Sequence, residues 1–299
     1  MSPEQESSRP LLTAAIAAGD LQSLEELSEQ LSGAGLLHQP DVQIIVAHTG
    51  RHDLVCDAAN VRIVSCPPGT PFFRLYATVL EQSDSEYVAL LDAGCPPGQG
   101  WLAAAREQFH AATAIFYGPV ECAWESGDPG MIGYLIEYAQ FRRPLDPQLG
   151  EYPGNNIVFR RVLAENAVTE EGGFQKTFFL RRVEKVQGIQ PRACDDMTVV
   201  YRKSYPWSCY LRRRMRHGRL YGSGHALSLG KRRFLYAGGT IVLPLLRYWR
   251  ILRAARRPPR LVREVVRFSV PIFISECAWS AGECLGYLAG AASDEACLD

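Results

Sequence analysis

The alternation of short apolar runs with helical stretches along the first 120 residues constrains the fold more than any other feature of this sequence. Each run is long enough for one buried strand, and the stretches between them carry apolar residues at the spacing of an amphipathic helix. The runs are Leu11–Ala17, Val42–Ala47, Val61–Ser65, Tyr87–Leu91 and Ala114–Val120, and helices are expected over Leu21–Leu31, Thr70–Gln82, Trp101–Phe109 and, further on, Phe174–Gln187. The pattern predicts an α/β fold with a mainly parallel sheet and flanking helices.

An acidic residue stands where one of these predicted strands ends. Asp92 directly follows the run Tyr87–Leu91 and precedes Ala93 and Gly94. In open α/β sheets, ligands bind beyond the carboxyl ends of the strands. A carboxylate there could hold Mg²⁺ or Mn²⁺ together with the phosphates of a nucleotide. The alternative is that Asp92 caps the following turn through Gly94.

The charges divide the chain into two parts although the formal net charge is zero. Residues 202–267 carry roughly 18 Lys and Arg but a single acid, Glu264, whereas residues 1–201 are acidic. We therefore predict an α/β domain over 1–201 and a basic, helical, membrane-associating segment over 202–299. Such a segment suits anionic lipid headgroups. Nucleic-acid binding is not expected, because no base-reading motif accompanies the basic residues. The remaining alternative is a helical surface that is simply solvated.

The apolar stretch Phe268–Ala292 is long enough to cross a bilayer but contains Glu276 and Glu283. It predicts a helix that lies in the membrane interface or is re-entrant, with a helix packed on the domain as the alternative. The nine cysteines show no zinc-site or disulfide spacing, and the N-terminus is polar and acidic, unlike a signal peptide. We expect reduced thiols and a cytoplasmic protein at the inner face of the membrane.

Four segments carry a resemblance to a known family. The stretch Ser83–Ala105, SDSEYVALLDAGCPPGQGWLAAA, resembles the segment of family 2 glycosyltransferases of the GT-A fold that holds their acidic metal motif. Arg74–Leu80 falls where that family has an ARNxGL-like helix, and Gly154–Arg161 is similar to its GNNxxxRR segment. Ala278–Gly290 resembles the closing AWxxGExxGYxxG helix of bacterial, membrane-associated members. The order and spacing of the segments agree over nearly the full length.

The resemblance implies a GT-A nucleotide-diphospho-sugar transferase fold with a C-terminal helical tail, and an inverting transfer to an unknown saccharide or lipid-linked acceptor. It implies a nucleotide-diphosphate sugar as donor and a divalent metal, Mg²⁺ or Mn²⁺, held by Asp92. Arg74, Asn155 and Asn156 are candidate binding residues on the donor and acceptor sides. Arg213, in the basic run after the transferase core, is placed to meet a diphosphate, for which the guanidinium is well shaped. The alternative for Arg213 is a helix surface near lipid.

The sequence departs from the family pattern at the acidic positions. One carboxylate, Asp92, remains where the family has two or three, and the second strand ends in His48 rather than in acidic residues. His48 could hydrogen-bond a nucleotide, and a lone surface histidine is the alternative. Lys176 occupies the place of an expected acid. Glu184 and Glu171 are the candidates for the base that takes the acceptor's proton, and the alternative for both is a solvated surface acid.

Two hypotheses follow from these observations. The first is a glycosyltransferase, supported by the ordered motif resemblance along the chain. The second is a catalytically degenerate glycosyltransferase-like binding or regulatory protein, favoured by the lost acids and by Lys176.

Overall fold

The computed structural model describes residues 9–18, 24–49, 58–68, 70–146, 149–165, 167–168, 173–256 and 258–290, with the side chains of 24–26 and 227–228 excepted. These residues form two compact units. Unit 1 contains the described residues of Met1–Glu121 and Phe141–Tyr201, and unit 2 contains those of Cys122–Gln140 and Arg202–Ala296. The segment 122–140, which the sequence analysis did not separate from the α/β region, thus groups with the helical tail.

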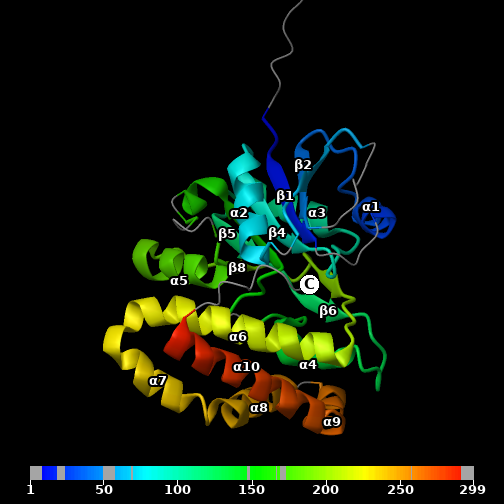
Figure 1. Cartoon of the computed structure of the whole chain (residues 1–299). Helices are drawn as coiled ribbons and strands as arrows, with labels where there is room; N and C mark the ends of the chain where they lie inside the picture. The colour runs from blue at the N-terminus through cyan, green and yellow to red at the C-terminus, as the bar shows by residue number, and fades with distance from the viewer. Residues whose placement is uncertain are drawn as a thin grey trace, which may run out of the picture. The chain divides into compact units, whose positions relative to one another are not determined.

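Unit 1 is built on a mixed, mostly parallel sheet with the strand order β3-β2-β1-β4-β7-β5-β8 among the described residues (Figure 1). Strand β7 is antiparallel to both of its neighbours, β4 and β5, and the other pairs in the sheet are parallel. The strands are β1 (Leu12–Ala18), β2 (Val42–His48), β3 (Val61–Ser65), β4 (Tyr87–Asp92), β5 (Ile115–Tyr117), β7 (Asn156–Arg160) and β8 (Arg192–Ala193). A separate two-stranded sheet pairs β6 (Val120–Cys122) with β9 (Val199–Tyr201).

Helices flank this sheet as the sequence predicts. They are α1 (Leu24–Gly33), α2 (Phe72–Gln82), α3 (Trp101–His110) and α5 (Lys176–Gln187). Helix α2 packs on β1 and β2 through an apolar face that includes Leu75, Val79 and Leu80. Strand β1 is buried along its whole length, because a central parallel strand is covered on both faces. The expected fold class, an α/β fold with a mainly parallel sheet, flanking helices and a C-terminal helical region, is confirmed.

Unit 2 is helical and is organised around α10 (Ser269–Ala289), which packs against each of the other helices of the unit (Figure 1). These are α4 (Met131–Glu137), α6 (Trp207–Leu229), α7 (Arg233–Gly239), α8 (Leu243–Ala254) and α9 (Pro259–Arg267). None of the described helices is both long and apolar enough to span a membrane. Helix α10 buries Glu276 and Glu283 inside unit 2, and the membrane association of this stretch stays a prediction.

A buried ion network holds α6 and α10 together. The Arg214 guanidinium lies 2.7 Å from a carboxylate oxygen of Glu276, and the side chains of both residues are almost fully buried. The indole of Trp279 lies near two guanidinium groups, with Arg214 4.5 Å and Arg247 4.6 Å from its ring centroid. Arg247 also pairs with Glu276 at 3.6 Å. These contacts explain how α10 buries two acids, because each has a cation beside it.

Candidate functional site

The carboxyl ends of three parallel strands meet at one edge of the sheet. The pairing register places Ala18 of β1 beside His48 of β2, and Ala17 of β1 beside Asp92 of β4. His48 is in turn in register with Ser65, the last residue of β3. Two of the predicted site residues, His48 and Asp92, therefore stand at the same edge, where α/β sheets bind ligands.

Asp92 is fixed by the turn that follows it. Its Oδ1 accepts a hydrogen bond from the Gly94 amide at 3.0 Å, and its carbonyl accepts one from the Cys95 amide at 2.8 Å. The residue is half-buried. The capping interaction that the sequence offered as an alternative is thus present. The same turn holds the carboxylate at the end of β4, so capping and ligand binding are compatible roles for it.

His48 is buried, with 1% of its surface exposed. Its Nε2 and the Ser65 hydroxyl form a hydrogen bond of 3.0 Å between the ends of β2 and β3. The neighbouring Thr49 is equally buried, and its hydroxyl oxygen has no hydrogen-bond partner among the described residues. The polar side chains of His48 and Thr49 are therefore buried at this edge of the sheet.

The adjacent residues Asn155 and Asn156 have opposite environments. The Asn156 amide is used inside the fold, since its Oδ1 accepts from the Trp101 indole at 2.9 Å and its Nδ2 donates to the carbonyls of Pro119 and Met197. Asn155 is just as buried, but neither atom of its amide group has a partner among the described residues. These contacts give Asn156 a positioning role, whereas the Asn155 amide has hydrogen-bonding capacity for a ligand.

Asn155 belongs to the same edge as Asp92. Strands β4 and β7 are antiparallel, and Leu91 lies opposite Asn156. Asp92 directly follows Leu91 and Asn155 directly precedes Asn156, so these two residues lie next to each other across the strands. The carboxylate of Asp92 and the unpartnered buried amide of Asn155 thus lie on neighbouring strands at the same edge of the sheet. The sequence analysis had both asparagines as equal candidates, because their different surroundings depend on residues far away in the chain.

Lys176, which the sequence marked only as a departure from the family pattern, lies at this edge too. Its ammonium donates a hydrogen bond to the carbonyl oxygen of Gly154 and lies 4.3 Å from the ring centroid of Tyr76. The Tyr76 hydroxyl donates to the carbonyl oxygen of Leu91 at 2.7 Å. Lys176 is therefore linked to both segments that carry the candidate ligands, namely the end of β4 and the start of β7. The only sequence feature that pointed to Lys176 was its positive charge at a position where the family has an acid.

Glu184, a predicted base, lies on α5 beside two tyrosines. It accepts a hydrogen bond from Tyr152, whose ring is 5.1 Å from that of Tyr117. Burial raises the pKa of Tyr152 to about 12, and the negative charge of Glu184 adds to the shift. Tyr152 therefore stays protonated and keeps donating to Glu184 across the physiological pH range. The second predicted base, Glu171, lies outside the described residues.

The two predicted arginines stand in different units. Arg74 is exposed in the first turn of α2, which begins after the loop that follows β3. Arg213 belongs to α6 of unit 2, where its guanidinium lies 4.5 Å from the ring centroid of Tyr205. Binding of a nucleotide sugar by either residue remains a prediction.

Among the described residues, Asp92 is the carboxylate that this edge offers to a divalent metal. No group of three or more His, Cys, Asp or Glu side chains that could hold a metal ion occurs in the described part of the chain. Asp92 contributes one carboxylate, the smallest number that a Mg²⁺ site shared with phosphates uses. The Lys176 ammonium lies at the same edge, and its positive charge opposes a second cation there.

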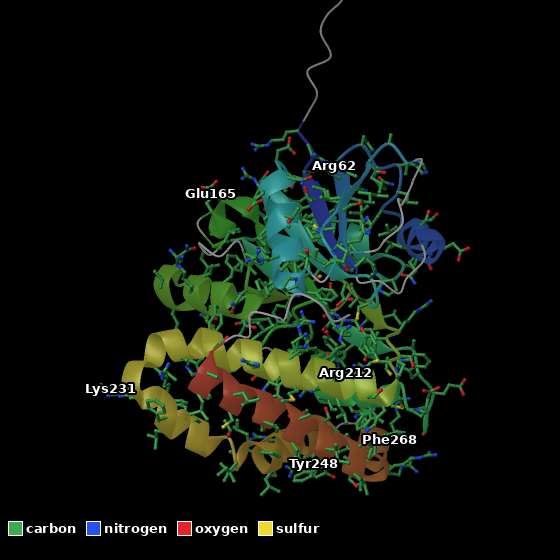
Figure 2. All side chains as sticks on the ribbon, viewed as in Figure 1. Arg62, Glu165, Arg212, Lys231, Tyr248 and Phe268 are labelled. Atoms are coloured by element: carbon green, nitrogen blue, oxygen red, sulfur yellow. The ribbon has the colours of Figure 1, made fainter. Side chains whose placement is uncertain are left out.

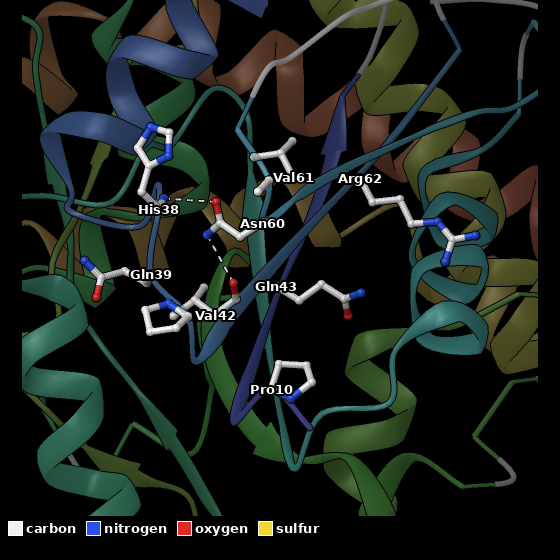
Figure 3. A pocket seen from close by; sticks show the side chains of 10 residues that line it. Pro10, His38, Gln39, Val42, Gln43, Asn60, Val61 and Arg62 are labelled. Carbon is white, nitrogen blue, oxygen red and sulfur yellow. Dashed lines mark hydrogen bonds between the residues drawn. The ribbon is translucent and has the colours of Figure 1, made fainter. Parts of the chain in front are cut away.

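A shallow hollow of about 510 Å³ lies elsewhere in unit 1, at the amino ends of the strands (Figure 3). Pro10, Val42 and Val61, which line it, precede or begin β1, β2 and β3. The side chain of Asn60 forms part of its wall (Figure 3). Its Oδ1 accepts a hydrogen bond from the His38 amide at 3.0 Å, and its Nδ2 donates one to the Val42 carbonyl at 3.1 Å. Because this hollow is at the opposite ends of the strands from Asp92, we do not assign the donor site to it.

Comparisons with known proteins find similarity only at the level of structure. No protein-family model matches the chain, and no curated protein matches it in sequence. The mannosyltransferase PcManGT from Pyrobaculum calidifontis, solved in complex with GDP-Man and Mn²⁺, is 15% identical, over 95% of this chain and 77% of its own, with a TM-score of 0.45. A mycobacterial protein is 15% identical, over 68% of this chain and 70% of its own, with a TM-score of 0.43. Both TM-scores are too low to transfer a function to this chain.

Proposed function

We propose that the chain is a glycosyltransferase that transfers a sugar from a nucleotide-diphosphate sugar to an acceptor hydroxyl. The observation that carries the proposal is the buried, unpartnered amide of Asn155, which directly precedes the residue opposite Leu91 and so lies at the same carboxyl edge as Asp92. A buried amide without a partner costs free energy, about 1–3 kcal/mol by mutational comparison, unless a ligand satisfies it. The motif resemblance of the sequence names the ligand class, and the site stands where α/β folds bind nucleotides.

The chemistry of an inverting transfer assigns roles to these residues. The acceptor oxygen attacks the anomeric carbon, its proton passes to a carboxylate base, and the nucleoside diphosphate leaves with the bonding electrons. Glu184 is the described acid that we propose as this base. It lies beside the Tyr152 hydroxyl, which donates to it. The acceptor is a saccharide or a lipid-linked saccharide under this proposal.

Calorimetric titration of the full chain with UDP-, GDP- and dTDP-sugars tests the donor site. We expect one donor to bind, and the Asn155→Ala variant to bind it at least about tenfold more weakly, the effect of losing one good hydrogen bond to a charged ligand. No binding of any donor by a protein that is folded by circular dichroism would refute the proposal. Binding without release of the nucleoside diphosphate from the donor, in the presence of membrane extract as acceptor, would favour the non-catalytic alternative.

We further propose that unit 2 docks on an anionic membrane surface, at its cytoplasmic face. Eight large apolar side chains between residues 234 and 249 are exposed, among them Leu235 at 78% and Ile241 at 82%. We call this set the α7–α8 surface; it consists of Phe234, Leu235, Tyr236, Ile241, Val242, Leu245, Leu246 and Trp249. Exposed apolar residues gathered in this way mark an interaction site rather than ordinary protein surface.

Positive charge next to the α7–α8 surface in the chain supports an anionic membrane as its partner. Lys231 and Arg232 precede α7 and are exposed, and Lys231 points away from the ribbon (Figure 2). Arg250, Arg253 and Arg256 are exposed at the other end of the set. Apolar groups beside several cations match the interface of a bilayer that contains anionic lipid, where each Lys or Arg near the surface contributes about 1 kcal/mol.

Vesicle sedimentation tests the membrane proposal. The full chain is expected to pellet with phosphatidylcholine vesicles that contain phosphatidylglycerol, and the double variant Ile241→Asn, Leu245→Asn to stay largely in the supernatant. Val186→Asn is the matched control, since Val186 is 75% exposed but lies on α5 of unit 1. Equal pelleting of the double variant and the wild type would refute this role of the surface. Concentration-dependent self-association in the absence of vesicles would instead identify a second copy of the chain as the partner.

A further inference from the structure

We propose that the Lys176 ammonium binds the diphosphate of the donor in place of the divalent metal that the family resemblance implies. The inference rests on the proposed function and makes it more specific, because it predicts that donor binding does not depend on metal. Three features of unit 1 carry it: the fixed position of Lys176, the location of its ammonium between two strand ends, and the polar groups that surround that location.

Packing against α2 fixes the chain just before Lys176. A Cβ atom at Gly173 would be 2.3 Å from a ring carbon of Phe73, so any side chain there would force this ring to move. The Phe174 amide donates to the Phe73 carbonyl at 2.8 Å, and the Phe174 side chain is buried. Lys176 follows as the first residue of α5. The backbone position of Lys176 is therefore fixed by the packing of Gly173 and Phe174 against α2.

The ammonium itself lies between the two segments that carry the candidate ligands. Its hydrogen bond to Gly154 places it next to the residue that precedes Asn155, and its contact with the Tyr76 ring places it next to the hydroxyl that holds Leu91. A phosphate group that accepted hydrogen bonds from the Asn155 amide at this edge would be within reach of a lysine chain. Lysine is a common phosphate ligand because its ammonium is a compact charge with three donors.

Two further features favour an anion at this place. Lys176 opens the twelve-residue helix α5, and a helix N-terminus favours negative charge. The buried Asn155 amide, which has no partner among the described residues, is an independent sign of a missing ligand. An ammonium at the same edge also repels a divalent cation and attracts a diphosphate.

Titration of the full chain with UDP and GDP in EDTA, and again in Mn²⁺, tests the inference. We expect the preferred nucleotide to bind with similar affinity in both buffers. Lys176→Gln should weaken binding in EDTA at least tenfold, and Lys176→Arg should weaken it less, because it keeps the charge. Lys185→Gln is the matched control, since Lys185 is an exposed lysine on the same helix and should leave affinity unchanged.

A charge reversal gives a second readout that loss of folding would not produce. Lys176→Glu places an acid near the Asp92 edge, so this variant should bind the nucleotide in Mn²⁺ and lose binding in EDTA. Wild-type binding that requires Mn²⁺, together with an unchanged affinity of Lys176→Gln, would overturn the inference while leaving the glycosyltransferase proposal intact. If no nucleotide and no nucleotide sugar binds in either buffer to the folded protein, the proposed function fails and the inference fails with it.

Discussion

Gly282 of α10 lies so close to Met215 of α6 that a Cβ atom at Gly282 would be 1.8 Å from the Met215 carbonyl oxygen. The same crowding occurs one turn on, where a Cβ at Gly286 would be 2.3 Å from the Arg219 carbonyl oxygen. Glycines of α6 face α10 in return, since a Cβ at Gly218 would be 2.1 Å from the carbonyl oxygen of Trp279. The two helices thus pack backbone against backbone, and this contact depends on the absence of side chains.

Gly282→Ala is therefore expected to destabilise unit 2. The added methyl group has no space, and the helices must move apart at a cost of about 1–3 kcal/mol or more. Urea unfolding followed by circular dichroism measures the change. Gly238→Ala is the matched control, because nothing lies within 4 Å of a Cβ at Gly238, which sits exposed in α7. Equal stability of the Gly282→Ala and wild-type proteins would contradict the packing described above.

Arg214→Met tests the buried ion pair between the same two helices. The substitution leaves the Glu276 carboxylate buried without its closest cation, and losing one partner of such a pair costs about 3–5 kcal/mol. Arg212→Met, at an exposed position of α6, should change the free energy of unfolding little. The double variant Arg214→Met, Glu276→Gln should recover part of the loss, because the uncompensated charge is gone. A double variant as unstable as the sum of both single changes would argue against the pairing.

Strands β1, β2 and β4 were predictable because burial on both faces gives each a largely apolar run. The run Tyr87–Leu91 became β4, Tyr87–Asp92, with the acid at its end as expected. The run Ala114–Val120 was predicted as one strand, but it forms β5 and β6, separated by Gly118 and Pro119. Proline gives no backbone donor to a ladder, and a Cβ at Gly118 would be 1.7 Å from the Met197 carbonyl oxygen.

Contacts between residues far apart in the sequence were not predictable. Glu264 of α9 accepts hydrogen bonds from Ser126 and from the Gly127 amide, which joins the segment 122–140 to the helical tail. No periodicity in either segment indicates this pairing. The same limit applies to the site: the sequence supplied Asp92 and both asparagines, but the partners that separate Asn155 from Asn156 come from three other segments of the chain.

Tyr152→Phe should alter the pH dependence of stability in the alkaline range. Burial and the charge of Glu184 raise the pKa of Tyr152 to about 12 in the folded chain, against about 10 when it is unfolded. The folded state therefore holds the proton to higher pH than the unfolded state. The contribution to the free energy of unfolding is constant below about pH 10 and is lost as the pH rises toward about 12.

The measurement for Tyr152 is the difference in tyrosinate absorbance between wild type and Tyr152→Phe as a function of pH. The missing chromophore should titrate well above the ordinary tyrosine range. Urea midpoints should also show a smaller decline between pH 9 and about pH 11 in the variant than in the wild type. A difference spectrum that titrates near about pH 10 would mean that the contact with Glu184 does not hold the proton.

Alanine substitutions at Asn155 and Asn156 should give opposite results although the residues are adjacent. Asn156→Ala leaves the Trp101 indole donor and the carbonyls of Pro119 and Met197 without their partner in a buried place. Each such group costs about 1–3 kcal/mol, so the variant should unfold at clearly lower urea concentration. Asn155→Ala removes an amide that has no partner among the described residues, so stability should be kept or increased.

For ligand binding, the affected residue is expected to be Asn155 rather than Asn156. Nucleotide-sugar affinity should fall at Asn155→Ala, whose stability is unimpaired, so the loss reports the missing contact rather than a damaged fold. Differential scanning fluorimetry with and without the bound nucleotide sugar gives both quantities from one preparation, because a ligand that binds the folded state raises the unfolding temperature. A strongly destabilised Asn155→Ala variant would mean that its amide is satisfied within the protein. The site would then have to be assigned to Asp92 and Lys176 without it.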